Sequence, residues 1–312
     1  MSDALLDHAT QTMNVGSKSF ATASRLFDAD TRRSALMLYA WCRHCDDVVD
    51  GQELGFALRP PHAQALEDPK VRLAALFEET RRAYAGQPMD DPAFAAFQEV
   101  AQRHGIPERH AFEHLDGFAM DVHQRQYQTL DDTLDYCYHV AGVVGLMMAR
   151  VMGVEDEPTL DRACDLGLAF QLTNIARDIV DDAEVGRCYL PLAWLDEAAI
   201  DPGALTAPEH REKLAVLATR LVEHAEPYYH SAVAGIGALP LRSAWAIATA
   251  RGVYREIGLK VRAEGAHAWD RRLSTNRWEK VRLLMGGAGV ALTVRSRPAE
   301  PRPAALWQRP LG

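Results

Sequence analysis

The sequence lacks any apolar run long enough to cross a lipid bilayer. Its longest run, residues 140–149, lies between His139 and Arg150 and has about half of the ~20 residues that a spanning helix needs. The first residues, MSDALLDHATQTM, carry no apolar stretch of the signal-peptide type. We therefore expect a cytoplasmic protein in which the apolar run forms a core helix. Peripheral contact with the inner face of the membrane is left undecided.

Cysteines are few and basic residues are not clustered. The cysteine count is odd and has no framework spacing, which argues against a disulfide scaffold and favours a reducing compartment. The net charge of -9 spreads along the chain without a block of lysine and arginine, so a nucleic-acid partner is not expected. A metal ion that neutralises carboxylates is the more natural partner. The five cysteines are Cys42, Cys45, Cys137, Cys164 and Cys188.

Patterns typical of strands are also scarce, whereas apolar residues recur at helical spacing along nearly the whole chain. We therefore predict an all-α fold with one domain at 1–295. A Pro- and Arg-rich tail at 296–312 should be irregular or mobile. The predicted helices cover 3–14, 31–50, 70–85, 92–103, 108–119, 131–152, 159–184, 192–198, 209–234, 240–264 and 276–290.

The stretch YAWCRHCDDVVDG crowds three aspartates into a segment that otherwise indicates a buried helix. Tyr39, Arg43, Asp46 and Asp50 follow one another at steps of four, three and four residues, so they share one helical face. Aspartate near the C-terminal end of a helix is disfavoured by the helix dipole. Another group must therefore stabilise this face. We place the N-cap of this helix at residue 30 or 31.

A second acidic face lies in the segment QLTNIARDIVDDAEVGRCYLP. Gln171, Asn174, Asp178 and Asp182 step by three, four and four along another predicted helix. Two helices thus each present an Asp-x-x-x-Asp face. Carboxylate and amide oxygens suit Mg²⁺ or Mn²⁺, and Mg²⁺ usually keeps waters and substrate phosphate oxygens as further ligands. The sequence therefore predicts that metal and diphosphate bind together.

The alternative is that these acidic faces are simply exposed to solvent. A single acidic stripe on a helix usually has that explanation. Here the neighbouring positions are apolar, among them Leu38, Val49, Ile175 and Ile179. Burying several like charges without a cation would cost several kcal/mol each. Two such faces in one chain therefore favour the metal site.

Five motifs in order make the chain resemble the squalene and phytoene synthase family, whose members join prenyl diphosphates head to head. The likeness runs from about Ser17 to Lys280. A further segment, DGFAMDVHQRQY, and the tail ALWQRP look most like bacterial phytoene synthases of carotenoid pathways. The motifs are SKSF (17–20), YAWCRHCDDVVD (39–50), DYCYHVAGVVG (135–145), the second acidic segment (171–191) and VYREIGLKVR (253–262).

The resemblance implies an isoprenoid synthase helical bundle around a central cavity, with Mg²⁺ between the acidic helices. Asp47 and Asp181 would support the metal ligands. The residues implied as metal ligands are Asp46, Asp50, Asn174, Asp178 and Asp182. Those implied near the diphosphates are Ser17, Ser19, Tyr39, Arg43, Arg177, Tyr189, Tyr254 and Arg271. Those implied around the prenyl chains are Tyr136, Val140, Gly145 and Gln171, and the glycines of 136–149 would let chains lie against the backbone.

The implied activity is a prenyltransferase reaction that converts two geranylgeranyl diphosphates through prephytoene diphosphate to phytoene. No nicotinamide is expected, because the glycine cluster at 286–289 is a poor dinucleotide turn. One alternative is a squalene or dehydrosqualene synthase that uses farnesyl diphosphate. A head-to-tail elongase or terpene cyclase is disfavoured by Asp182, where a cyclase usually has glutamate. A non-catalytic scaffold protein on the same fold would tend to lose the aspartates, and both sets are intact here.

Overall fold

The computed structural model describes residues 2–16, 18–53, 56–57, 68–296 and 300–311. These residues form a helical bundle with one small antiparallel hairpin, β1 (Gln52–Glu53) and β2 (Phe56–Ala57). The all-α prediction is confirmed. The helices are α1 (Ser2–Gly16), α2 (Lys18–Ser24), α3 (Ala29–Asp50), α4 (Pro69–Tyr84), α5 (Pro92–His104), α6 (Glu108–Val122), α7 (Leu130–Cys137), α8 (Val143–Val151), α9 (Glu157–Glu184), α10 (Leu192–Ala198), α11 (Arg211–Ile236), α12 (Leu241–Glu264) and α13 (Arg277–Thr293).

Capping residues explain where the first acidic helix begins and ends. The Asp28 carboxylate accepts hydrogen bonds from the backbone N–H groups of Asp30, at 3.1 Å, and Thr31, at 3.0 Å. Asp28 is therefore the N-cap, and the predicted cap at residue 30 or 31 was wrong by about two positions. Gly51, at φ 63°, closes the other end in the left-handed conformation. The sequence could not separate three neighbouring residues that all favour caps. The short helix α2 was not predicted.

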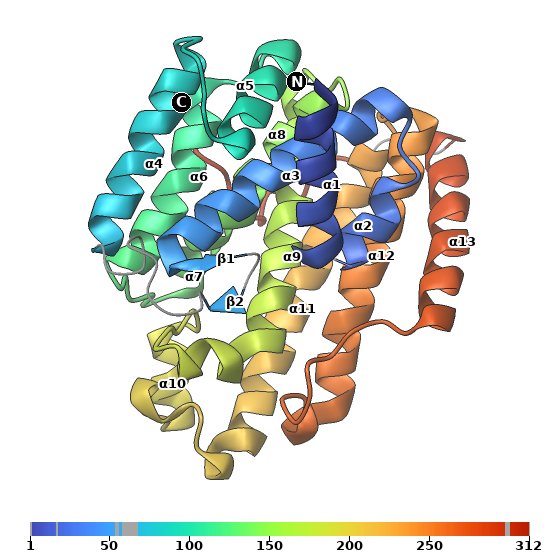
Figure 1. Cartoon of the computed structure of the whole chain (residues 1–312). Coiled ribbons are helices and arrows are strands. Elements are labelled where there is room, and N and C mark those ends of the chain that lie inside the picture. The colour runs from blue at the N-terminus through green and yellow to red at the C-terminus, as the bar shows by residue number, and fades with distance from the viewer. Residues whose placement is uncertain (1, 17, 54–55, 58–67, 297–299, 312) are drawn as a thin grey trace.

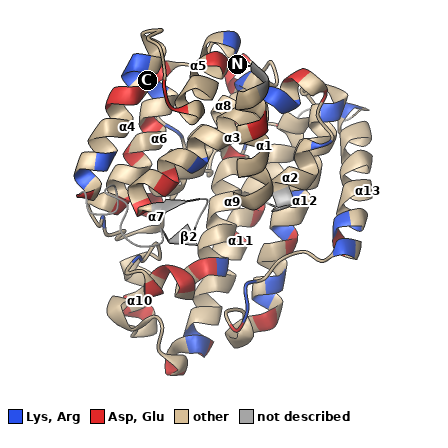
Figure 2. Cartoon of the chain, viewed as in Figure 1, with Lys and Arg blue, Asp and Glu red and all other residues tan. Residues whose placement is uncertain are grey.

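Helix α9 runs through the centre of the bundle, where it packs against α8, α11 and α12 (Figure 1). Helix α13 lies at the outer edge and packs mainly on α12. Figure 2 shows that most of its length is uncharged, with basic residues near its N-terminal end. Within the described residues, no helix is long and apolar enough to span a membrane.

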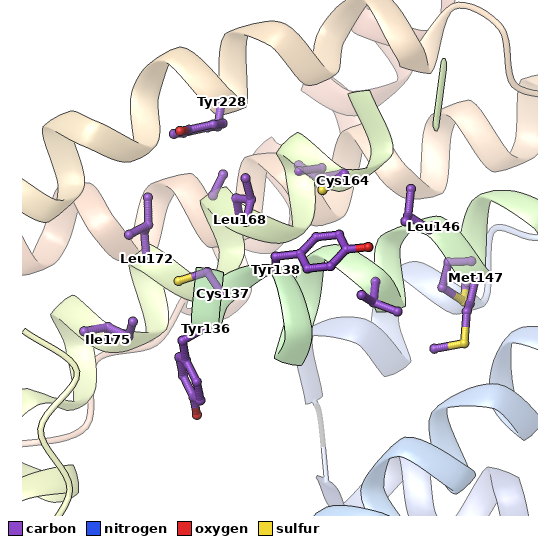
Figure 3. Packing of buried hydrophobic residues seen from close by; sticks show 14 of the residues in the cluster. Tyr136, Cys137, Tyr138, Leu146, Met147, Cys164, Leu168, Leu172, Ile175 and Tyr228 are labelled. Atoms are coloured by element: carbon purple, nitrogen blue, oxygen red, sulfur yellow. The ribbon is translucent and has the colours of Figure 1, made fainter. Parts of the chain in front are cut away.

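The buried side of α9 forms the middle of the hydrophobic core. Leu168, Leu172 and Ile175 lie along it, with Cys137 of α7 and Tyr228 of α11 nearby (Figure 3). All five side chains are at most 5% exposed. Burial of this apolar surface is the main force that holds α9 in place. The polar groups on its other positions are therefore carried on a rigid support.

A π-helical turn, Tyr138–Gly142, joins α7 to α8 inside the helix that the sequence predicts as continuous. Such turns widen the helix locally and occur frequently at functional sites. Beyond it, a Cβ on Gly145 would lie 2.5 Å from the carbonyl oxygen of Ala163. A Cβ on Gly167 would lie 2.4 Å from that of Ala141. These glycines let α9 approach α8 and the π-helical turn closely, so helix packing accounts for them.

The described part of the tail, residues 300–311, is irregular, as expected. It is nevertheless bound to the bundle. Arg302 forms an ion pair with Asp165 of α9 at 2.7 Å, and the backbone N–H of Trp307 donates to the Tyr228 hydroxyl at 3.1 Å. The sequence offered an irregular or a mobile tail, and the contacts show an irregular segment that is anchored.

Gly167→Ala is expected to lower the free energy of unfolding by about 1–3 kcal/mol, because the added methyl group would overpack the contact with the π-helical turn. Gly286→Ala in α13 is the matched control, since no described heavy atom outside its own helix lies within 4 Å of a Cβ there. Alanine at that helical position should stabilise by up to about 1 kcal/mol. Urea unfolding measures both variants. Equal responses would contradict the close approach of α9 to the π-helical turn.

Candidate active site

An apolar cavity of about 260 Å³ lies beside α9. It extends from Gln171 and Asn174, one turn before the second aspartate pair, to Thr159, which is ~22 Å away along the helix axis. Most of its wall is aliphatic or aromatic and comes from α3, α8, α9, α11 and α12. The wall includes Phe20, Tyr39, Val140, Val144, Gly145, Met148, Met152, Leu166, Phe170, Ile236, Leu239 and Tyr254.

The α3 aspartates lie near the Gln171 end and are paired with arginines. Arg43 donates two hydrogen bonds to Asp47, at 2.6 and 3.0 Å, and forms an ion pair with Asp46 at 3.2 Å. Asp47 therefore orients Arg43, and its expected support of the metal ligands stays a prediction. Asp50, one turn further on, accepts hydrogen bonds from Arg187, which follows α9.

The α9 aspartates are paired in a similar way. Arg177 donates to both oxygens of its neighbour Asp178. Arg272, in the segment between α12 and α13, reaches Asp178 at 3.2 Å and Asp181 at 3.4 Å. Three separate segments thus supply the guanidinium groups around the two acidic helices. This side of the cavity carries both signs of charge at high density.

The two acidic helices come together around Arg187. Its guanidinium group contacts Asp50 of α3, and its charge also acts on Asp182 of α9 and Asp121 of α6. Partial loss of water raises the pKa of Asp46 and of Asp182 to about 7, and neighbouring carboxylates raise them further while the arginines oppose the shift. The same loss of water raises the pKa of Asp121 to about 6. Loss of water, with like charges nearby, therefore disfavours the ionised form of these three carboxyl groups.

Asp121 also organises a group of buried tyrosines. Its carboxylate accepts hydrogen bonds from the hydroxyls of Tyr189, at 3.0 Å, and Tyr136, at 3.2 Å. The two rings stack with their centroids 4.5 Å apart. Burial raises the pKa of both phenols, so they stay protonated and act as hydrogen-bond donors. These tyrosines support the acidic site and do not line the described cavity wall.

Two further tyrosines stand where the charged site meets the cavity. Tyr254 stacks on Phe170 at a centroid distance of 4.2 Å, and Tyr39 stacks on Phe20 at 6.1 Å. Asn174 donates to the side-chain oxygen of Gln171 at 3.2 Å, which orients both amides. These residues lie at the end of the apolar cavity, about one to two helical turns from the aspartate pairs of α3 and α9. A ligand with a charged head and a hydrocarbon tail would fit such an arrangement.

Among the described residues, the structure brings most of the sequence-predicted residues together, and Arg271 and Tyr136 are exceptions. Arg271 was misplaced: it is exposed and pairs with Glu264 at 3.1 Å, while Arg272 next to it reaches the aspartates. Tyr136 belongs with Asp121 and not with the cavity wall. Ser17 and the side chain of Ser19 lie outside the described residues.

Sequence reasoning missed Asp121, Arg187 and Arg272 as site residues. Asp121 and Arg187 both lie inside segments that carried the family likeness, so a signal for them was present. Their roles were invisible because each partner lies on a different helix. The sequence could not show which of Arg271 and Arg272 reaches the aspartates, because this depends on the path of the irregular segment that contains both.

The side chains of the two acidic helices offer oxygen donors to a divalent metal ion. In the part of the chain that the structure describes, no three carboxylate, imidazole or thiol groups are arranged to hold a metal ion as they stand, and arginines bind Asp50 and Asp178. The donors are nonetheless all oxygen atoms, and loss of water together with neighbouring carboxylates raises the pKa of Asp46 and Asp182, an effect that a bound cation would oppose. A hard cation suits this chemistry. The five predicted ligands stay a prediction.

Comparison with known proteins identifies the family. A family model described as squalene/phytoene synthase matches residues 13–279. The chain belongs to the squalene/phytoene synthase family. It is 66% identical over 307 residues to the 15-cis-phytoene synthase of Pantoea ananas, with 98% of each chain covered. It is 51% identical over 312 residues to that of Paracoccus sp., with 99% of each covered.

Solved structures agree with this family assignment. A dehydrosqualene synthase in complex with a ligand matches with a TM-score of 0.81 at 25% identity, over 92% of this chain and 96% of the other. A squalene synthase from Alicyclobacillus acidocaldarius matches with a TM-score of 0.72 at 22% identity, over 85% and 95%. The second likeness speaks for the fold alone. The predicted single helical bundle of the isoprenoid synthase type is confirmed by these structures.

Proposed function

We propose that this protein is a phytoene synthase of carotenoid biosynthesis. It joins two geranylgeranyl diphosphates head to head through prephytoene diphosphate and forms phytoene. The observation that carries the proposal is the apolar cavity beside α9, which begins next to the charged groups of two acidic helices. Relatives at 51% and 66% identity over nearly their whole lengths have the name 15-cis-phytoene synthase.

The arginines provide for the departure of diphosphate. Arg43, Arg177 and Arg272 already bind carboxylates around the cavity entrance and can exchange these partners for phosphate oxygens. Positive charge at that position stabilises the leaving group when the allylic C–O bond breaks. Mg²⁺, when bound by the aspartates, would supply further positive charge to the diphosphates. Asp47 keeps Arg43 in place meanwhile.

The cavity protects the carbocations that result. After the first ionisation, the double bond of the second substrate attacks and a proton is lost, which gives a cyclopropyl diphosphate. A second ionisation, rearrangement and proton loss then give the hydrocarbon, so no hydride donor is consumed. Water would quench these cations, and the aliphatic wall around Val144 and Met148 excludes it. The stacked Tyr254 and Phe170 offer aromatic faces near the entrance.

The product assay tests this proposal. Purified protein with Mg²⁺ and geranylgeranyl diphosphate, without NADPH, is expected to form phytoene, identified by mass spectrometry. Farnesyl diphosphate should react much more slowly. A marked preference for farnesyl diphosphate would contradict the substrate length. A hydrocarbon that forms only with NADPH would contradict the redox assignment and would indicate squalene.

We propose that Mg²⁺ binds between the acidic helices, supported by their all-oxygen donor set and the paired aspartates of each helix. Mg²⁺ should then raise the melting temperature of the wild-type protein, and a chelator should reverse this. Asp46→Asn should lose most of that stabilisation and about 100-fold or more in turnover. Without metal it should melt at or above the wild-type temperature, because a like charge has been removed.

Asp131→Asn is the matched control for this experiment, because Asp131 is an exposed residue in the first turn of α7. It should respond to Mg²⁺ as the wild-type protein does. Full turnover after thorough chelation would refute the metal requirement. Equal stabilisation of Asp46→Asn and the wild type by Mg²⁺ would refute the ligand assignment.

We also propose peripheral contact with an anionic membrane through α13. Four apolar residues lie along one exposed face of this helix and are between 48% and 78% exposed. Arg277 and Arg282 flank that face. Apolar side chains that enter the headgroup region and basic ones beside them favour anionic lipid surfaces. The apolar residues are Trp278, Val281, Met285 and Leu292.

Sedimentation with lipid vesicles tests the membrane proposal. Wild-type protein should bind vesicles that contain phosphatidylglycerol more strongly than pure phosphatidylcholine. The double variant Trp278→Ser with Met285→Ser should bind at least about tenfold more weakly, since it lacks two apolar side chains that would enter the membrane. Val216→Ser, at a residue 67% exposed on α11, is the control and should bind normally. Unchanged binding by the double variant would exclude this face.

A further inference from the structure

One charged side chain lies at the end of the cavity that is remote from the aspartates. Among the described residues that line the cavity, Arg162 of α9 alone carries a formal charge. It is only 9% exposed, and burial lowers the pKa of its guanidinium group. A charged group held beside an apolar space is costly unless hydrogen bonds satisfy it. The hydrogen-bond partners of Arg162 therefore determine the position of its side chain.

Those partners come from α11 and from the C-terminal tail. One terminal nitrogen of Arg162 donates to the Ser231 hydroxyl at 2.9 Å and to the Ser231 carbonyl oxygen at 3.2 Å. The other donates to the carbonyl oxygen of Glu300 at 2.5 Å. The stem is confined as well, because a Cβ on Gly235 would lie 2.6 Å from the Cβ of Arg162. The side chain cannot turn aside without breaking these bonds.

A buried carboxylate connects the tail to the same group. Asp165, one turn after Arg162 on α9, has no exposed surface. It accepts hydrogen bonds from Arg302 at 2.9 and 2.7 Å and from the Ser231 hydroxyl. Arg302 also donates to the Trp307 carbonyl oxygen at 2.6 Å, which folds the tail back on itself. The pair of Asp165 and Arg302 thus holds in place the tail segment whose backbone binds Arg162.

Trp307 and Arg309 hold the end of the tail against the bundle. The backbone N–H of Trp307 donates to the hydroxyl of Tyr228 of α11. The centroid of the Trp307 ring lies 5.6 Å from the centroid of the Tyr138 ring. Arg309 donates to Asp161 at 2.6 Å and also to Glu157, both in the first turns of α9. The tail therefore spans the N-terminal part of α9, beside the remote end of the cavity.

We propose that the C-terminal segment 300–309 sets the depth of the cavity by holding Arg162 across its remote end, and so limits the length of prenyl chain that the enzyme accepts. A longer chain would have to displace Arg162 and break its three hydrogen bonds. Arg162 is the residue that determines length, and Asp165 and Arg302 position it. This inference rests on the proposed prenyl diphosphate substrate.

The test compares geranylgeranyl diphosphate with geranylfarnesyl diphosphate, which is longer by one isoprene unit. Arg162→Ala should raise the kcat/KM ratio of the longer to the shorter substrate by at least about tenfold. The change should come mainly from a lower KM for the longer substrate. A hydrocarbon longer by two isoprene units should appear in the mass spectrum.

The Asp165–Arg302 pair needs a variant that removes both partners, so that neither of the two is left buried without the other. Asp165→Asn combined with Arg302→Met meets this need, because removal of one partner only would strongly destabilise the fold. The double variant should shift the substrate ratio in the same direction as Arg162→Ala, and Arg302→Lys should stay closer to the wild type. Arg220→Ala is the control, since Arg220 forms a surface ion pair with Glu197.

Binding measurements separate this inference from the proposed function. Dissociation constants of unreactive thiodiphosphate analogues of both lengths should show the same shift in ratio in the Arg162→Ala and double variants. Ratios within about twofold of wild type, in binding and in turnover, would overturn the inference while leaving the proposed function intact. If wild-type protein does not turn over geranylgeranyl diphosphate, the proposed function fails, and the binding ratios still decide whether Arg162 limits chain length.

Discussion

Repulsion among carboxylates at the edge of an apolar cavity is the constraint on which the rest of the structure depends. Asp46, Asp50, Asp121 and Asp182 come from three helices, and Arg187 is the cation that they share. Left to themselves, these groups would separate and draw in water. They stay together because each helix is held by burial of its apolar face. Burial of the apolar faces thus offsets the free-energy cost of holding these carboxylates close together.

Helix α9 relates the parts of the site to one another. Its C-terminal half carries the second aspartate pair, its middle forms one wall of the cavity, and its N-terminal half carries Arg162 and Asp165. Because a helix rises by about 1.5 Å per residue, the distance from the charged groups to the remote end of the cavity is set by the number of residues between them. Helix α9 thereby sets the distance between the groups that bind the diphosphate and the remote end of the cavity, and with it the chain length that fits.

The helices and their acidic faces were predictable because both depend on local geometry. Steps of three and four residues place Asp46 above Asp50 and Asp178 above Asp182 in any helix. The errors arose where several local choices were equivalent. Asp28 and Asp30 are both good N-caps, and Arg271 and Arg272 are adjacent in a segment with no period. Because these alternatives are neighbours in the sequence, only the packing around them determines which residue is the N-cap and which arginine reaches the aspartates.

The sequence by itself determined the helical fold, the two acidic faces and the likeness to a family of prenyl diphosphate synthases. Only the tertiary structure decided which arginines meet which carboxylates and how the tail is bound. The physical reason is the separation along the chain of the residues that determine each feature. A helical face depends on residues within two turns, whereas Asp165 and Arg302 are 137 positions apart and meet only because α9, α11 and the tail pack together. The depth of the cavity belongs to this second class, since it depends on Arg162 and on the backbone of Glu300.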